Sequence, residues 1–70
     1  MTQSDLDNWF SYHIPIAGQP ERYVAIRDAG KRLAEVIVAN TPASADQTAS
    51  IRKIREAVMT ANAAIACGGK

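Results

Sequence analysis

Two apolar stripes with helical spacing run through most of this 70-residue chain. Their members recur at alternating intervals of three and four residues, which is the seam of a helix that packs against another helix. Only about four residues separate the two segments, so they predict an antiparallel two-helix hairpin within an all-α fold. The first stripe consists of Tyr23, Ile26, Gly30, Leu33 and Ile37, and the second of Ile51, Ile54, Val58, Ala61 and Ile65.

The N-terminal part predicts a short helix and an irregular connector. Leu6, Trp9 and Phe10 share one face of a helix that starts near Ser4. Proline and glycine then interrupt regular structure before Pro20, which suits the first turn of the next helix. We therefore expect one domain over residues 1–70, with a helix at about 4–11, a connector at 12–19 and hairpin helices at about 20–39 and 44–67.

The ends of the hairpin helices carry their own signals. Asn40-Thr41-Pro42 ends the first helix, because proline cannot continue it. Ser44 and Gln47 match a capping box at the start of the second, and Gly68-Gly69 stops it. Gly30 lowers helix propensity by about 1 kcal/mol relative to alanine. We expect the close approach of another backbone to compensate for this glycine.

Size and composition predict self-association. A chain this short buries only about 60% of its unfolded surface and usually needs a disulfide, a metal or a partner copy. Cys67 is the only cysteine, and together with His13 it offers too few ligands for structural zinc. Off-stripe valines and the alanine-rich stretch 57–66 leave apolar surface that a hairpin alone does not cover. We therefore expect a compact, symmetric homo-oligomer.

Charge and motifs exclude several functions. A net charge of +1 and a pI near 7.9 argue against duplex nucleic acid as partner. No apolar run approaches the roughly 18 residues of a membrane span, and the polar N-terminus is unlike a signal peptide. One free thiol fits a reducing cytoplasm. No glycine-rich phosphate loop and no catalytic triad signature is present, so we expect neither an enzyme nor a cofactor.

Five residues are candidates for ligand binding, each with a structural alternative. Tyr12 and His13 could stack on a planar base, or belong to an aromatic cluster with Trp9 and Phe10 that plugs the open end of the hairpin. Arg27 and Lys31 share a helix face that could hold a phosphate or simply be solvated. Asn62 could face a ligand, or form an interhelix hydrogen bond. A second basic cluster, Arg52-Lys53-Arg55, is expected to be solvated surface.

A family resemblance covers roughly residues 9–67. The sequence resembles the small helical-hairpin nucleotide sponges with which phages counter bacterial CBASS immunity, and larger relatives carry the same hairpin and act against Thoeris signalling. The YHxP and MxANAAIA elements together make the resemblance fairly specific. The residues that carry it are Phe10-Ser11-Tyr12-His13-x-Pro15, Gln19, Arg22-Tyr23-x-x-Ile26-Arg27, Pro42-x-Ser44 and Ala57-Val58-Met59-x-Ala61-Asn62-Ala63-Ala64-Ile65-Ala66.

The resemblance implies a protein that binds cyclic oligonucleotide messengers without cleaving them, in the cytoplasm of the infected bacterial host. Family members look like compact hexamers with pockets between protomers. The ligands are cyclic dinucleotides such as cyclic GMP-AMP and, for some members, cyclic trinucleotides at separate sites. By resemblance, Tyr12 stacks on a base, Arg27 faces a phosphate and His13 lies beside the same pocket. Relatives often have a polar or basic residue where Cys67-Gly68-Gly69 follows here, so dinucleotides are favoured over trinucleotides.

Two other functions remain open at this point. An oligomeric helical adaptor would bind a host protein through its apolar faces and would ignore nucleotides. A small DNA-binding regulator would retard duplex DNA in a salt-dependent manner. Stabilisation by cyclic dinucleotides, without duplex binding, distinguishes the sponge from both.

Overall fold

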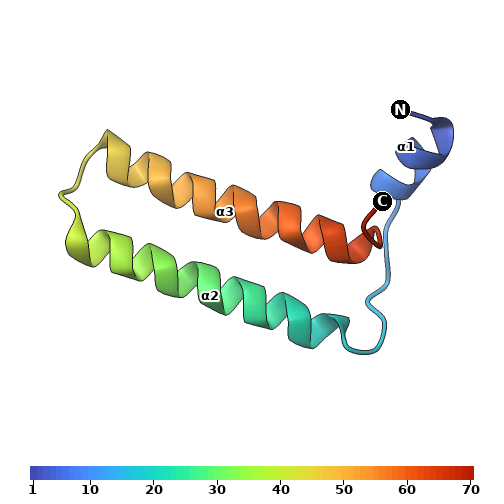
Figure 1. The fold of residues 1–70 in the computed structure, drawn as a ribbon, viewed down its shortest axis with the longest axis horizontal. Coiled ribbons are helices and arrows are strands. Elements are labelled where there is room, and N and C mark those ends of the chain that lie inside the picture. The colour runs from blue at the N-terminus through green and yellow to red at the C-terminus, as the bar shows by residue number, and fades with distance from the viewer.

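Three helices and no strand make up the computed structural model, which describes all of residues 1–70. The short α1 spans Gln3–Trp9, and the two long helices are α2, Gln19–Asn40, and α3, Ala45–Ala66. Helices α2 and α3 lie side by side in opposite directions, and α1 sits beyond their open end, near the C-terminus (Figure 1). The all-α prediction with an antiparallel hairpin is confirmed.

A capping box starts α1 earlier than the expected Ser4. The Thr2 hydroxyl accepts the backbone N–H of Asp5 at 3.1 Å, and the Asp5 carboxylate accepts the N–H of Thr2 at 3.0 Å. The helix ends at Trp9, two residues before the expected residue 11. Gly18 precedes α2 with a φ of 85°, a left-handed conformation that glycine adopts without strain, and Pro20 occupies the first turn as predicted.

The seam between α2 and α3 follows the predicted stripes with one exception. All five members of the second stripe are half-buried. On α2, Leu33 is 51% exposed and Ala34 takes its place in the seam. At Gly30, a Cβ atom would stand 2.7 Å from Cγ2 of Val58 and 3.5 Å from Cγ2 of Ile54. The glycine therefore makes room for side chains of α3, and not for the backbone that we expected.

The ends of α3 are capped by local hydrogen bonds. The Ser44 hydroxyl accepts the Gln47 backbone N–H at 3.2 Å, as predicted, but the Gln47 amide does not return to Ser44. It donates to the carbonyl and hydroxyl oxygens of Thr41, which fastens the interhelix loop to α3. At the C-terminal end, Gly68 and Gly69 donate to the carbonyls of Ile65 and Ala64, which forms a Schellman motif.

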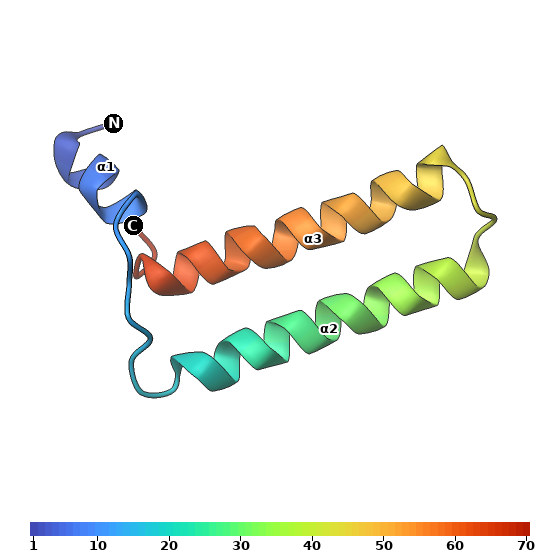
Figure 2. The same cartoon turned by 180° about the vertical axis from the view of Figure 1, so that it is seen from behind.

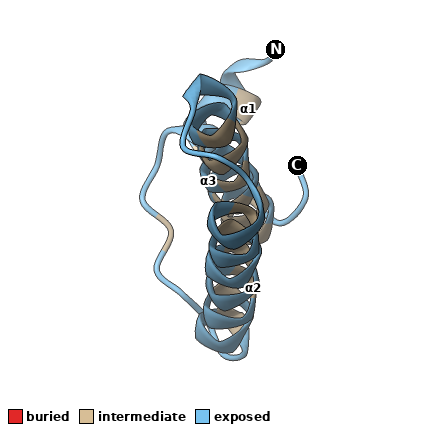
Figure 3. Ribbon diagram, turned by 90° about the vertical axis from the view of Figure 1, so that its left-hand side faces the viewer, coloured by how far each residue is buried: buried red, intermediate tan, exposed pale blue.

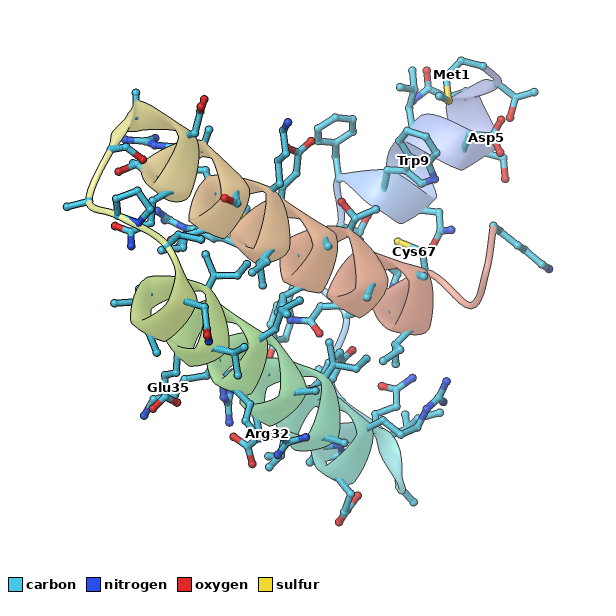
Figure 4. The ribbon with its side chains drawn as sticks, turned by 60° about the vertical axis from the view of Figure 1, so that its left-hand side comes forward. Met1, Asp5, Trp9, Arg32, Glu35 and Cys67 are labelled. Atoms are coloured by element: carbon cyan, nitrogen blue, oxygen red, sulfur yellow. The ribbon has the colours of Figure 1, made fainter.

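Long-range hydrogen bonds attach the N-terminal segment to the end of α3. The Asn8 amide donates to the carbonyl of Cys67 at 3.3 Å, and the Trp9 indole N–H donates to that of Lys70 at 2.9 Å. Figure 4 shows Trp9 and Cys67 near each other where α1 meets the end of α3. Gln19 closes the connector from the other side by donating to the Ile65 carbonyl at 3.4 Å. The connector is therefore held at both of its ends.

No residue of the single chain is fully buried. The ribbon coloured by burial contains only intermediate and exposed segments (Figure 3). The accessible surface is 5558 Å², whereas a folded monomer of this mass exposes about 4,200 Å². The radius of gyration is 15.1 Å, against about 11 Å for a compact chain of this length. The protomer therefore exposes roughly 1,300 Å² more surface than a compact domain of its mass.

Candidate functional site

The connector places Tyr12 and His13 differently, although they are neighbours in sequence. The imidazole Nε2 of His13 lies 2.6 Å from the carbonyl oxygen of Asn8. A carbonyl only accepts hydrogen bonds, so Nε2 carries the proton and donates. His13 is half-buried, and this bond ties the connector to the end of α1. Its other nitrogen, Nδ1, is the one left to meet a ligand.

Tyr12 presents its aromatic ring to solvent. Its side chain is 84% exposed, the highest value among the large hydrophobic residues. The ring contributes nothing to a core within the single chain, and its faces can accept a planar partner such as a nucleobase. The structure thus leaves Tyr12 free for the stacking role that the sequence suggested.

The structural alternative, an aromatic cluster that plugs the open end of the hairpin, does not hold for Phe10, which is 82% exposed. Trp9 is 52% exposed and contacts the C-terminal tail through its indole N–H. Both rings stand beside a groove of about 590 Å³ along the outer side of α3. The groove is otherwise lined by Met59, Thr60, Ala63, Ala64, Cys67, Gly69 and Lys70. None of the five predicted site residues lines this groove. The apolar stretch 57–66 had, however, predicted exposed apolar surface on α3.

Arg27 and Lys31 lie one position after the seam residues Ile26 and Gly30, and both are exposed. Asn62 lies one position after the seam residue Ala61 on α3. In two antiparallel right-handed helices, positions that directly follow the seam turn to the same broad side of the pair. We call this side the basic face. In Figure 2, α2 runs from left to right below α3, and the basic face points toward the viewer.

Asn62 is half-buried, and its Oδ1 atom is shielded from solvent without a hydrogen-bond donor. The interhelix hydrogen bond that we considered for this amide is therefore not formed through Oδ1. A buried acceptor without a donor costs about 1–3 kcal/mol. The amide oxygen of Asn62 therefore lacks a hydrogen bond that another molecule could supply.

The connector runs on the same side of the hairpin as the basic face (Figures 2 and 3). The structure therefore brings Arg27, Lys31 and Asn62 to one face and holds Tyr12 and His13 at its open end. It does not close these five residues into one pocket within a single chain. No cluster of histidine, cysteine and acidic residues could hold a metal ion. No helix has the length and apolarity to cross a bilayer.

Comparison with known proteins gives one match. The family model described as the Acb2/Tad1 hairpin domain matches residues 2–66. No curated protein and no solved structure matches the chain. The family match spans all three helices and the connector, so it includes every one of the five candidate residues.

Proposed function

Because the chain belongs to the Acb2/Tad1 hairpin family, a family of cyclic nucleotide sponges, we propose that it sequesters cyclic dinucleotide messengers such as cyclic GMP-AMP. The protein binds the ligand without cleaving it and releases it unchanged. It therefore acts by stoichiometric sequestration and not by catalysis. In an infected bacterial cytoplasm, such binding deprives a CBASS effector of its signal. The observation that carries the proposal is the family match over residues 2–66.

Stacking and charge supply the binding energy in this proposal. The exposed ring of Tyr12 stacks on a base, which contributes about 1–3 kcal/mol. The planar guanidinium of Arg27 donates two parallel hydrogen bonds to a phosphate. A sponge must bind more tightly than the effector does, so nanomolar affinity, about −12 kcal/mol, is the relevant scale. His13, Lys31 and Asn62 complete the proposed ligand-binding set.

A compact homo-oligomer, which the family resemblance suggests is a hexamer, forms the pocket in this proposal. The surplus of roughly 1,300 Å² over a compact monomer supports association, because a standard interface buries about 800 Å² on each partner. The groove beside Trp9 and Phe10 offers apolar surface for a neighbouring copy. Tyr12 from the connector and the cations of the basic face then lie together at the interface between protomers.

A thermal-shift panel of cyclic di- and trinucleotides, followed by calorimetry, tests the function. We expect cyclic dinucleotides to raise the melting temperature and to be recovered unchanged after heat denaturation. Tyr12→Ala and Arg27→Ala each remove tight binding while the mass of the assembly by light scattering stays the same. Tyr12→Phe keeps the stacking ring, and Arg32→Ala removes a cation that has acidic neighbours on its own helix; both retain binding.

Three results contradict the proposal. If no cyclic nucleotide stabilises the wild-type chain, the sponge function is wrong. Recovery of linear products after heating means an enzyme. Unchanged affinity in both Tyr12→Ala and Arg27→Ala removes the site assignment.

A further inference from the structure

Most cations on the two long helices have an acidic neighbour three or four positions away, where opposite charges on a helix attract. Arg27 and Arg55 have none on either side. Arg22 is a third such residue, but it lies in the first turn of α2 and turns away from the basic face. The cations with an acidic residue at this spacing are Lys31, Arg32, Arg52 and Lys53, and the acidic residues are Asp28, Glu35 and Glu56.

Arg55 belongs to the basic face. It directly follows the seam residue Ile54 on α3, as Arg27 follows Ile26 on α2, and both arginines are exposed. Gly30 faces Ile54 and Val58, and this contact fixes the register of the two helices. Arg55 therefore stands nearly level with Lys31, one helical turn along the hairpin from Arg27.

The spacing of the two arginines follows from helix geometry. The four residues from the level of Arg27 to that of Lys31 correspond to about 6 Å along the axis. Packed helix axes lie about 8–10 Å apart. The two side chains thus start on the order of 10 Å from each other on different helices, and both can swing over the seam between them.

On these grounds, and resting on the proposed function, we propose that Arg55 is a second phosphate-binding residue. Arg27 and Arg55 form a clamp in which each guanidinium takes one of the two phosphates of a cyclic dinucleotide. Neither arginine has a carboxylate on its own helix that would compete for its charge. Lys31 stands nearly level with Arg55, but it has Asp28 and Glu35 at i−3 and i+4 as acidic neighbours on its own helix.

The test compares Arg55→Ala with the matched control Arg52→Ala in the full-length chain. Arg52 lies three positions earlier on the same helix and has Glu56 as a neighbour at i+4. We measure the affinity for cyclic GMP-AMP by calorimetry at two salt concentrations, and the mass of the assembly by light scattering. Arg55→Ala should weaken binding at least tenfold, flatten its salt dependence and leave the mass unchanged. Arg52→Ala should stay within threefold of wild type, and Arg55→Lys should bind with intermediate affinity, because it restores the charge without the planar fork.

Two outcomes overturn the clamp while the sponge function stands. One is a wild-type protein that binds cyclic GMP-AMP together with an Arg55→Ala variant of equal affinity. The other is an Arg55→Ala variant that loses binding only because its assembly falls apart, since Arg55 would then serve the contact between protomers. A wild-type chain that binds no cyclic dinucleotide rejects the proposed function itself, and the clamp with it.

Discussion

Replacing Gly30 by alanine should destabilise the protein, although alanine is the better helix former. At an unhindered helical position, this change gains about 1 kcal/mol. Here the new Cβ atom would lie 2.7 Å from Cγ2 of Val58, whereas ordinary contacts begin at 3.4 Å. Val58 is β-branched, and one χ1 rotamer dominates in helices, so its methyl group does not rotate away easily. The helices must move apart by several tenths of an ångström instead.

The magnitude follows from two opposing terms. Overpacking a seam costs about 1–3 kcal/mol, and the helix propensity returns about 1 kcal/mol. The net loss in the free energy of unfolding is then about 1 kcal/mol, or roughly 4–8 °C in melting temperature for a domain of this size. In a Val58→Ala background the obstructing methyl group is absent, so the same Gly30→Ala change should stabilise by about 1 kcal/mol.

Urea unfolding followed by circular dichroism at 222 nm measures both effects, with the protomer concentration held constant because association contributes to stability. Ala29→Gly, at the exposed neighbouring position, calibrates the propensity difference in the same helix. The decisive observation is the reversal of sign between the two backgrounds. If Gly30→Ala stabilises the wild-type chain as much as it stabilises Val58→Ala, the close contact at the seam is not real.

Two further predictions concern the helix ends. Ser44→Ala removes the acceptor for the Gln47 N–H and should lower stability by about 1 kcal/mol, measurable by thermal unfolding; no change would mean that the cap is redundant with the Gln47–Thr41 bonds. Hydrogen bonds from Thr2 lower the pKa of Asp5 below 3.8, so its stabilisation of α1 is complete above pH 3.8 and is lost as the pH falls through the lowered value. The Thr2 amide proton shift in NMR titration should report this loss, and Asp5→Asn should abolish it.

Local chemistry explains which parts of the fold could be predicted. The seam of Ile51, Ile54 and Val58 and the cap at Ser44 depend on residues within one or two turns, and the sequence displays those directly. Leu33 misled us because its spacing fits a helix seam as well as that of Ala34 does. The choice between them depends on how α2 is rotated against α3, which is decided by the close approach at Gly30.

Long-range pairs explain what could not be predicted. The Asn8 amide and the Cys67 carbonyl are 59 residues apart, and neither local sequence predicts the hydrogen bond between them. Phe10 was expected to plug the hairpin on its apolarity alone, but the attachment of α1 to the end of α3 leaves its ring outside. The place of Arg55 on the basic face could not be predicted for the same reason. Arg55 and Arg27 come together only once the hairpin register is known.

In the proposed site, Tyr12 and His13 have different tasks: His13 anchors the connector, and Tyr12 keeps its ring exposed. His13 is held to α1 by its bond to the Asn8 carbonyl, and Gln19 holds the far end of the connector to α3. Tyr12 lies between Asn8 and His13, inside the turn that the His13 bond closes, and its ring stays 84% exposed. An exposed ring on a tethered segment loses less conformational freedom when it meets a ligand than a ring on a free loop does. Under the proposed function, the anchoring of His13 therefore contributes to affinity alongside the stacking surface of Tyr12.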